Sequence, residues 1–331
     1  DILNNNTIRS MQWLLSILVA VALATQQAAA RSSSARMGTC LETGGLDNGT
    51  LVLECTGIVD GSEITTILTE LGATEVESIS ISESPELTSM PDGVFGDTAV
   101  HHLSFYDTGL QSLSASVFTS PTAESLQSLY IKRCPDFTKL ESSLIGGLSG
   151  LERLYLSFSG LTELSDPLPA TGLQYIDLTH NKIVTIADDY FIAAEALNIV
   201  LLGFNNFSSD SVCCSTQTFT APDGDLYLDF GYNALSAGLL GFVFPSAAPR
   251  ELILSGNNIE YLNETTYAPL MDQMGSQYTD AYILLDSNPL QCGCDLSWVV
   301  DEPNRHMLKN ALCINGQIVD NLSSEDFEDC P

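Results

Sequence analysis

Apolar residues recur along the chain in a short phrase, in which one apolar position is followed by two alternating ones and a small polar residue. The most regular copy is Leu173-x-x-Ile176-x-Leu178-x-x-Asn181. Eight further copies align with it, and they end at Ser84, Thr108, Cys134, Ser159, Asn205, Asn233, Asn257 and Asn288. Alternation is the period of a β-strand, in which successive side chains point to opposite faces. The pattern therefore predicts nine short strands, each with an apolar and an outward face.

Successive phrases are separated by 22 to 31 residues. A period of this length predicts a solenoid, in which each coil buries its apolar side against its neighbours. The strands should stack in parallel, while the variable segments form the convex side. The small polar residue that ends each phrase should turn inward and pair with backbone groups. On the convex side, Phe95, Phe118 and Phe191 occur at matching offsets, and we expect them to stack in the core.

The phrases resemble leucine-rich repeats, and the segment Pro91-x-Gly93-x-Phe95 resembles the second half of the typical extracellular repeat. The resemblance implies an α/β solenoid, namely a leucine-rich repeat horseshoe with a parallel concave sheet. It would contain about nine repeats between two disulfide-bonded caps, since an open array needs its apolar ends covered.

Four cysteines lie near the C-terminus, in the run Cys292-x-Cys294-x-x-x-Trp298 and at Cys313 and Cys330. The residues alone allow three disulfide pairings, and a zinc site is the competing interpretation. Predicted secretion and the lack of a second closely spaced cysteine pair favour disulfides. The run resembles the cysteine-rich C-terminal flank of secreted leucine-rich repeat proteins. That resemblance implies the bonds Cys292–Cys313 and Cys294–Cys330, with Trp298 covering the last coil.

The N-terminal cap is expected to be thinner, with one disulfide between Cys40 and Cys55 around a hairpin turn. Leu51-x-Leu53 should then form the first strand of the sheet. Both caps should contain a helix. The first is indicated by helical spacing of apolar residues at Ile64, Ile67, Leu68 and Leu71, with Asp60 or Ser62 as its N-cap. The second should be capped by Asp295.

The predicted organisation has five segments. Residues 1–10 form a polar leader before Met11, and residues 11–30 form a signal peptide, an apolar run that ends in small residues. No positive charge lies between Met11 and the apolar run, which departs from the usual pattern. The N-terminal cap and helix take residues 31–75, the repeats 76–290 and the C-terminal cap 291–331. No later run of 18 apolar residues exists, so we expect a secreted, extracellular protein without a transmembrane segment.

Secretion makes four Asn-x-Ser/Thr sequons candidates for glycosylation, at Asn48, Asn206, Asn263 and Asn321. Cys134 ends a repeat phrase, so we expect it to be buried and free. The pairing of the adjacent Cys213 and Cys214 stays open.

The net charge and the missing catalytic motifs exclude several classes of function. The chain has 42 acidic and 11 basic residues, for a net charge of −31, and this excludes polyanions such as nucleic acid as partners. No nucleophile elbow, phosphate loop or zinc-protease motif is present. The acidic residues Asp223, Asp225 and Asp229 lack the spacing of a calcium loop, and the four histidines, His101, His102, His180 and His306, do not converge. We therefore predict no metal, no cofactor and no enzymatic activity.

The outward strand positions collect aromatic and basic residues. Seven of the eleven tyrosines fall there, and aromatic residues are enriched at protein interfaces. The predicted partner-binding residues are Tyr106, Tyr130, Lys132, Arg133, Arg153, Tyr155, Phe158 and Tyr175. Further outward aromatics are Phe204, Tyr227, Tyr232 and Tyr282. The alternative is that tyrosine simply favours strands.

The plan of the whole chain resembles arthropod proteins named as the non-catalytic subunit of Oplophorus luciferin 2-monooxygenase. The shared plan comprises the early cysteine pair, the helix, serine-rich first repeats, the Asn-Pro-Leu-x-Cys-x-Cys-Asp-Leu-x-Trp run and an acidic tail. The resemblance implies an accessory subunit that stabilises a secreted partner within a hetero-oligomer. An innate-immune or adhesion recognition protein, which binds a secreted or cell-surface protein through the same face, is the alternative.

Overall fold

The computed structural model describes residues 40–44, 51–208, 217–220, 225–236, 242–245 and 248–330. The predicted leader and signal peptide lie outside the described residues. So do the sequon at Asn48, the cysteines Cys213 and Cys214, and Asp223.

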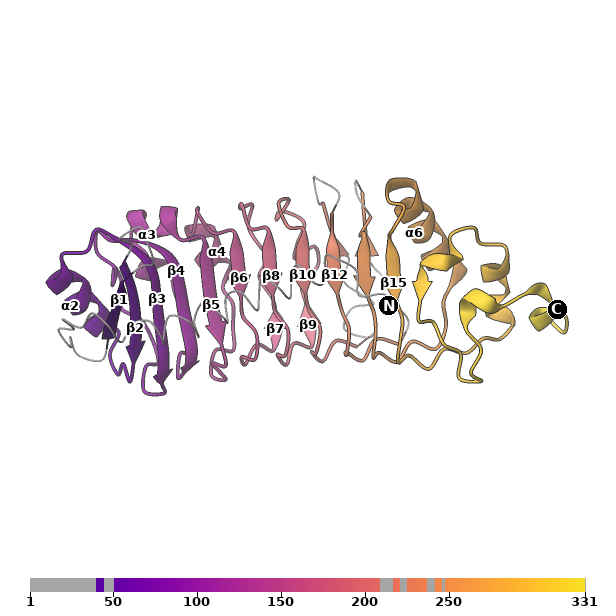
Figure 1. The fold of residues 1–331 in the computed structure, drawn as a ribbon, viewed down its shortest axis with the longest axis horizontal. Helices are drawn as coiled ribbons and strands as arrows, with labels where there is room; N and C mark the ends of the chain where they lie inside the picture. The colour runs from indigo at the N-terminus through magenta and orange to yellow at the C-terminus, as the bar shows by residue number, and fades with distance from the viewer. Residues whose placement is uncertain are drawn as a thin grey trace.

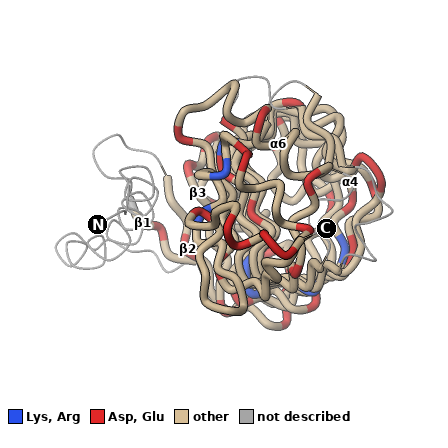
Figure 2. The backbone as a smooth tube through the Cα atoms, turned by 90° about the vertical axis from the view of Figure 1, so that its right-hand side faces the viewer, with Lys and Arg blue, Asp and Glu red and all other residues tan. Residues whose placement is uncertain are grey.

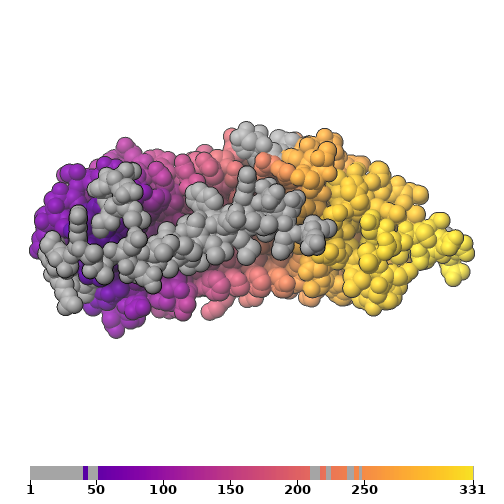
Figure 3. All heavy atoms as spheres, in the orientation of Figure 1, coloured from indigo at the N-terminus to yellow at the C-terminus, as the bar shows by residue number. Residues whose placement is uncertain are grey.

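One twelve-stranded sheet runs along the whole molecule, and its strands stand side by side along the long axis (Figure 1). In spatial order the strands are β1 (Cys40–Gly44), β2 (Leu51–Thr56), β3 (Glu75–Ser84), β4 (Ala99–Thr108), β5 (Ser128–Lys132), β6 (Arg153–Tyr155), β8 (Tyr175–Asp177), β10 (Ile199–Leu201), β12 (Tyr227–Asp229), β14 (Glu251–Ile253), β15 (Tyr282–Leu284) and β16 (Leu308–Lys309). All neighbours are parallel except β1 and β2, which form an antiparallel hairpin. The molecule is elongated, and each coil lies between its sequence neighbours (Figure 3).

The nine repeat phrases form the nine strands β3, β4, β5, β6, β8, β10, β12, β14 and β15. Equivalent positions of successive phrases are paired in register, as Leu154 with Ile176 and Ile176 with Val200. These inward side chains are fully buried. The leucine-rich repeat solenoid expected from the pattern is therefore confirmed, with β1, β2 and β16 as three additional strands from the caps.

Short and varied elements form the side of the coils opposite the sheet. They include the 3₁₀ turn η2 (Ala115–Val117), the helices α3 (Ser120–Ser125), α4 (Ser142–Gly147) and α6 (Glu264–Gln277), and two small parallel sheets. One small sheet pairs β7 (Glu163–Leu164) with β9 (Thr185–Ile186), and the other pairs β11 (Gln217–Thr218) with β13 (Phe242–Val243). Variation in repeat length is absorbed here, since the sheet keeps the same register throughout.

The polar residue that ends each phrase holds neighbouring coils together, and it is buried in every repeat except at Asn233, which is partly buried. At Asn181 the side-chain amide donates to the carbonyls of Leu156 (2.6 Å) and Leu178 (3.0 Å), while its oxygen accepts from the Ser159 (3.2 Å) and Leu161 (3.3 Å) amides. The same pattern is repeated by Asn205, Asn233, Asn257 and Asn288. The predicted inward turn of these residues is confirmed.

The aromatic spine of the core is divided into two parts. Phe95 stacks on Phe118, with ring centroids 5.7 Å apart, as expected. Phe191 does not continue that stack, because the two intervening coils bury the aliphatic Ile145 and Leu168. Phe191 instead stacks on Phe219 of the following coil, at 5.3 Å. The expectation of one continuous stack is therefore wrong.

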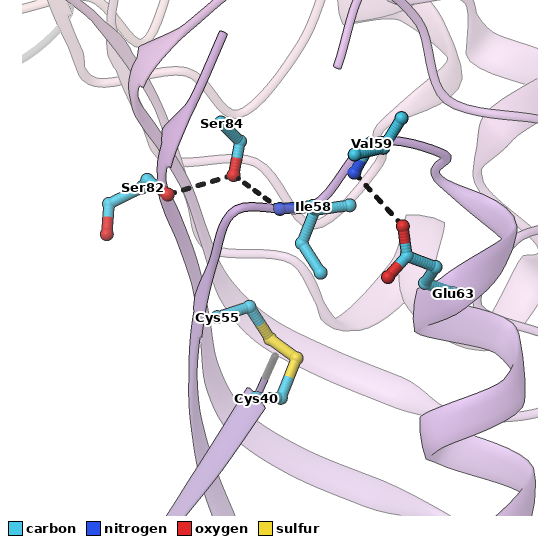
Figure 4. Close-up of a disulfide and its surroundings, with 7 residues drawn as sticks. All are labelled: Cys40, Cys55, Ile58, Val59, Glu63, Ser82 and Ser84. Atoms are coloured by element: carbon cyan, nitrogen blue, oxygen red, sulfur yellow. Dashed lines mark hydrogen bonds between the residues drawn. A yellow bond between two sulfur atoms is a disulfide. The ribbon is translucent and has the colours of Figure 1, made fainter. Parts of the chain in front are cut away.

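The N-terminal end is covered by the β1–β2 hairpin, which the disulfide Cys40–Cys55 closes (Figure 4). Beside the disulfide, the Ser84 hydroxyl accepts a hydrogen bond from the Ile58 amide, 2.9 Å away, and ties the cap to β3. The helix α2 (Ser62–Leu71) has Gly61 at its N-cap, so the predicted cap at Asp60 or Ser62 is wrong. Asp60 still accepts a hydrogen bond from the Ser62 amide, which lowers the pKa of its carboxyl group.

The C-terminal cap contains the disulfides Cys292–Cys313 and Cys294–Cys330, which are the two expected pairs. Its first turn is a 3₁₀ helix, η3 (Cys294–Val300), with Gly293 as the N-cap. Asp295 lies inside this turn, because the helix already begins at Cys294, and the predicted cap is therefore wrong. Trp298 packs partly buried against the core and donates to the Leu262 carbonyl, at 3.1 Å.

Candidate binding surface on the open sheet face

One face of the twelve-stranded sheet packs on the core, and we call the other the open sheet face. It corresponds to the predicted concave face. Each repeat contributes two outward strand positions to it and two more in the turn that follows, before the buried polar residue. In the repeat of β6, for example, these positions are Arg153, Tyr155, Ser157 and Phe158, of which Ser157 is buried beneath its neighbours.

Three of the predicted tyrosines form a stack across neighbouring strands. The rings of Tyr130 and Tyr155 lie parallel with centroids 4.3 Å apart, and Tyr155 contacts Tyr175 at 4.7 Å. The ammonium group of Lys132 lies 5.0 Å from the centre of the Tyr155 ring, within range of a cation–π contact. Burial raises the pKa of Tyr155 and Tyr175 above the usual value, so both hydroxyls stay protonated. The stack is a neutral aromatic platform with one cation above it.

The other predicted cations are held by acidic neighbours. Arg133 donates to the Tyr106 hydroxyl (3.1 Å) and pairs with Asp107 (2.8 Å), with its guanidinium 5.4 Å from the centre of the Tyr106 ring. Arg153 pairs with Glu152 at 3.5 Å. The structure therefore brings Tyr106 and Arg133 together, and Tyr130, Lys132, Tyr155 and Tyr175 together. We call these six residues with Arg153 the tyrosine patch.

Phe158 belongs to a different group, whose stacking was not predicted from the sequence. Its ring stacks on His180 (4.0 Å), His180 stacks on Phe204 (4.2 Å), and Phe204 stacks on Tyr232 (4.4 Å). The rings are within 12° of parallel, and the side chains of Phe158, Phe204 and Tyr232 are 53%, 43% and 48% exposed. We call these four residues the ring column.

The ring column is aligned by an unusual backbone conformation. Each member immediately precedes the polar residue that ends its repeat phrase and has a φ of 55° or 56°. This left-handed region is uncommon for bulky side chains, and here every coil imposes it at the same place. Gly256 occupies the equivalent position in the next repeat, and a Cβ there would meet the Tyr232 ring at 2.5 Å. The ring column ends at Tyr232 because Gly256 has no side chain, and the Tyr232 ring packs directly on the Gly256 backbone.

The part of the open sheet face between β8 and β15 has a different character. One row of outward residues pairs strand by strand as Asp177, Leu201, Asp229, Ile253 and Leu284. A second row is formed by Tyr175, Ile199, Tyr227, Glu251 and Tyr282. The two rows thus combine seven apolar or aromatic side chains with the three carboxylates Asp177, Asp229 and Glu251, and no Lys or Arg occurs in either row.

Asp229 lies at the centre of the first row, between Leu201 and Ile253. It accepts a hydrogen bond from the Gly231 amide at 2.7 Å and lies against Gly203 and Gly231, which have no side chains to displace it. Burial raises the pKa of the Asp229 carboxyl, the Gly231 hydrogen bond lowers it, and the charge of Asp177 raises it further. Asp177 is buried and accepts from the Thr179 amide (2.9 Å) and hydroxyl (2.7 Å).

The predicted glycosylation sites and the predicted free cysteine are not part of the binding surface, and glycosylation stays a prediction. Asn206, Asn263 and Asn321 are exposed, and the Asn263 side chain accepts from the Thr265 amide at the start of α6. Cys134 is buried and free, with its thiol 3.2 Å from the Thr108 hydroxyl. Within the described ranges no three His, Cys, Asp or Glu side chains are placed to hold a metal ion. In that same part of the chain, no helix is both long and apolar enough to span a membrane.

The outward aromatics predicted from the sequence include the tyrosines of the tyrosine patch and Phe158, Phe204 and Tyr232 of the ring column. The stacking of the ring column through His180 and the two rows between β8 and β15 were not predicted. A signal for the column was present, because aligning the phrases puts Phe158, His180, Phe204 and Tyr232 in one register. The carboxylates of the two rows between β8 and β15 are harder to single out in the sequence, since carboxylates are common throughout so acidic a chain.

The chain is similar to extracellular leucine-rich repeat proteins. Lumican of Coturnix japonica is 27% identical over 162 residues, covering 47% of this chain and 43% of lumican. Fibromodulin of Mus musculus is 29% identical over 170 residues, covering 51% of this chain and 42% of fibromodulin. The chain thus spans less than half the length of these curated relatives. No protein-family model matches it.

A solved structure supports the fold over nearly the whole chain. It is the octameric complex of latrophilin 3 (Lec, Olf), Unc5D (Ig, Ig2, TSP1) and FLRT2 (LRR), in which the matching chain is 17% identical with a TM-score of 0.51. The match covers 90% of this chain and 95% of the other. Together with the register of the twelve strands, it establishes that the chain is a leucine-rich repeat solenoid with disulfide-bonded ends.

Proposed function

We propose that this protein is a secreted, non-catalytic recognition protein that binds another extracellular protein through the tyrosine patch. The observation that carries the proposal is the aromatic stack of Tyr130, Tyr155 and Tyr175 on the open sheet face. Tyrosine offers a large, stiff contact area with a polar tip, and interfaces gain most of their energy from a few such residues.

The arrangement of charge favours recognition over catalysis. The cations of the patch are paired with carboxylates or lie over tyrosine rings, so they present a fixed pattern of charge to a partner. Catalysis would require a nucleophile or base aimed at a pocket together with groups that stabilise the transition state. The described part of the patch brings together no such set.

The relatives favour extracellular recognition or adhesion over a role beside a monooxygenase. Lumican and fibromodulin are extracellular leucine-rich repeat proteins, and similarity to them gives no support to a luciferase subunit. An accessory subunit of a secreted luciferase-like monooxygenase is a finer hypothesis that rests on the resemblance of the whole chain. In either case the signal peptide would direct secretion, and the exposed sequons would carry glycans.

The proposal is tested by replacing the centre of the stack. Tyr130→Ser with Tyr155→Ser should abolish binding of a partner recovered from the native extracellular fluid and purified, as measured by surface plasmon resonance. Loss of at least about a hundredfold in affinity is expected, because central aromatic anchors contribute about 2 kcal/mol or more each.

Tyr261→Ser is the matched control, since Tyr261 is also exposed but lies outside every strand of the sheet. Circular dichroism should show unchanged folding for both variants. If the double variant folds and binds the partner as tightly as the control, the tyrosine patch is not the binding surface.

A further inference from the structure

The open sheet face between β8 and β15 combines apolar surface with negative charge. Asp229 lies directly between Leu201 on β10 and Ile253 on β14, and Asp177 lies on the far side of Leu201. Neighbouring strands are about 4.8 Å apart, so the two carboxylates are about 10 Å apart across one leucine. Beyond Gly231, the edge of this region is formed by Phe204 and Tyr232 of the ring column.

The carboxylates of this region have no cationic partner on the described part of the face. Asp177 and Asp229 receive hydrogen bonds from Thr179 and Gly231, which are neutral. Glu251 accepts from the Tyr282 hydroxyl at 2.6 Å, and Asp286 accepts from the Ser255 hydroxyl.

The arginine that precedes β14 already forms ion pairs with other carboxylates. Arg250 lies at the end of that strand opposite the ring column, and it pairs there with Asp225 (2.9 Å) and Asp280. Half-buried carboxylates without counterions produce a strong local negative potential, because the low dielectric around them screens charge poorly.

We propose that this region binds a protein segment in which a Lys or Arg is flanked by apolar side chains. The cation would lie against Asp229, with Asp177 adding to the attraction. The flanking apolar groups would pack on Leu201 and Ile253. We call these four residues the acidic site.

Charge complementarity identifies this occupant. An acidic or neutral segment would leave Asp177 and Asp229 desolvated without compensation, which costs more than an apolar contact returns. A polybasic segment without apolar residues would leave Leu201 and Ile253 uncovered. The acidic site thus selects for a segment that is both basic and apolar. This inference goes beyond the proposed function because it uses residues outside the tyrosine patch.

Synthetic peptides provide the test. An array of 12-residue peptides would carry one central Lys, Arg, Gln or Glu between Leu, Ile and Tyr residues, and it would be probed with the full chain. The Lys and Arg members should be retained. For the best peptide, fluorescence anisotropy should show at least a tenfold loss of affinity with Asp229→Asn, and a similar loss when the central cation becomes Gln.

Two control variants show whether the loss of binding is specific to the acidic site. Glu195→Gln removes an exposed carboxylate outside the large sheet, and it should leave peptide binding unchanged. The side-chain oxygen of the Asp229→Asn variant can still accept the Gly231 hydrogen bond, so this variant should preserve the fold. The Tyr106→Ser variant changes the tyrosine patch three strands away from Asp177, and it should bind the peptide normally even if the proposed function proves wrong.

The proposal is overturned if the array retains no basic peptide or prefers Gln or Glu members. It is equally overturned if Asp229→Asn and Glu195→Gln bind the best peptide alike.

Discussion

The surroundings of the Asp229 carboxyl disfavour its ionised form. Burial and the nearby Asp177 both raise its pKa above the usual value, and the Gly231 amide offsets them only in part. Tyr227 on the same strand and Glu251 on β14 add no positive charge. A group that costs stability in the free protein is often retained for binding.

Replacing Asp229 should therefore stabilise the free protein. Because the folded-state pKa is raised, the ionised group lowers the free energy of unfolding at pH values above it, and this cost disappears below about pH 4. Asp229→Asn should raise the free energy of unfolding by about 0.5 kcal/mol at pH 7. The gain should vanish at about pH 3, as measured by urea unfolding at both values. A gain that is equal at both pH values would show that charge is not its cause.

Between elements, the buried asparagines bind each strand to its neighbour. Asn181 connects the turn after β8 with that after β6 through hydrogen bonds to Leu156, Ser159 and Leu161. Ser159 has a shorter side chain and donates to the Ile131 carbonyl at 3.2 Å. The side chain of Asn181 therefore makes more hydrogen bonds to the preceding coil than the side chain of Ser159 does.

This difference predicts unequal effects of truncation. Asn181→Ala leaves the backbone groups of Leu156, Ser159 and Leu161 without a partner in the interior, and should cost about 2–4 kcal/mol. Ser159→Ala leaves fewer groups unpaired and should cost about 1 kcal/mol. Chemical denaturation of both variants measures the difference. Equal losses in the free energy of unfolding would mean that the additional hydrogen bonds of Asn181 do not contribute to stability.

The same elements show what the sequence could predict. The inward residues, the register and the buried asparagines follow from alternation and spacing, because each is repeated in every coil. The division of the aromatic core was not predictable from Phe95, Phe118 and Phe191 alone, since it depends on the aliphatic residues buried between them. The contacts within the ring column depend on a left-handed backbone that the sequence of Phe158 or Phe204 does not itself favour.

Across the whole molecule, negative charge outweighs positive charge, with 42 acidic residues against 11 basic ones. Acidic segments also predominate in the view along the long axis (Figure 2). The elongated solenoid spreads this charge over a long surface, and its caps hold the ends with three disulfides. Ion pairs such as that of Arg250 with Asp225 offset only a small part of the repulsion.

The excess of negative charge predicts that salt stabilises this protein. Raising sodium chloride from about 10 mM to about 150 mM shortens the Debye length from about 30 Å to about 8 Å. Repulsion between carboxylates on neighbouring coils is then screened, while the few exposed ion pairs lose little. The melting temperature should rise by about 2–5 °C in calorimetry, and potassium chloride should act equally, because Debye screening depends on ionic strength and not on which monovalent cation is present. A melting temperature that falls with salt would show that the ion pairs, rather than the net charge, dominate the electrostatics of the fold.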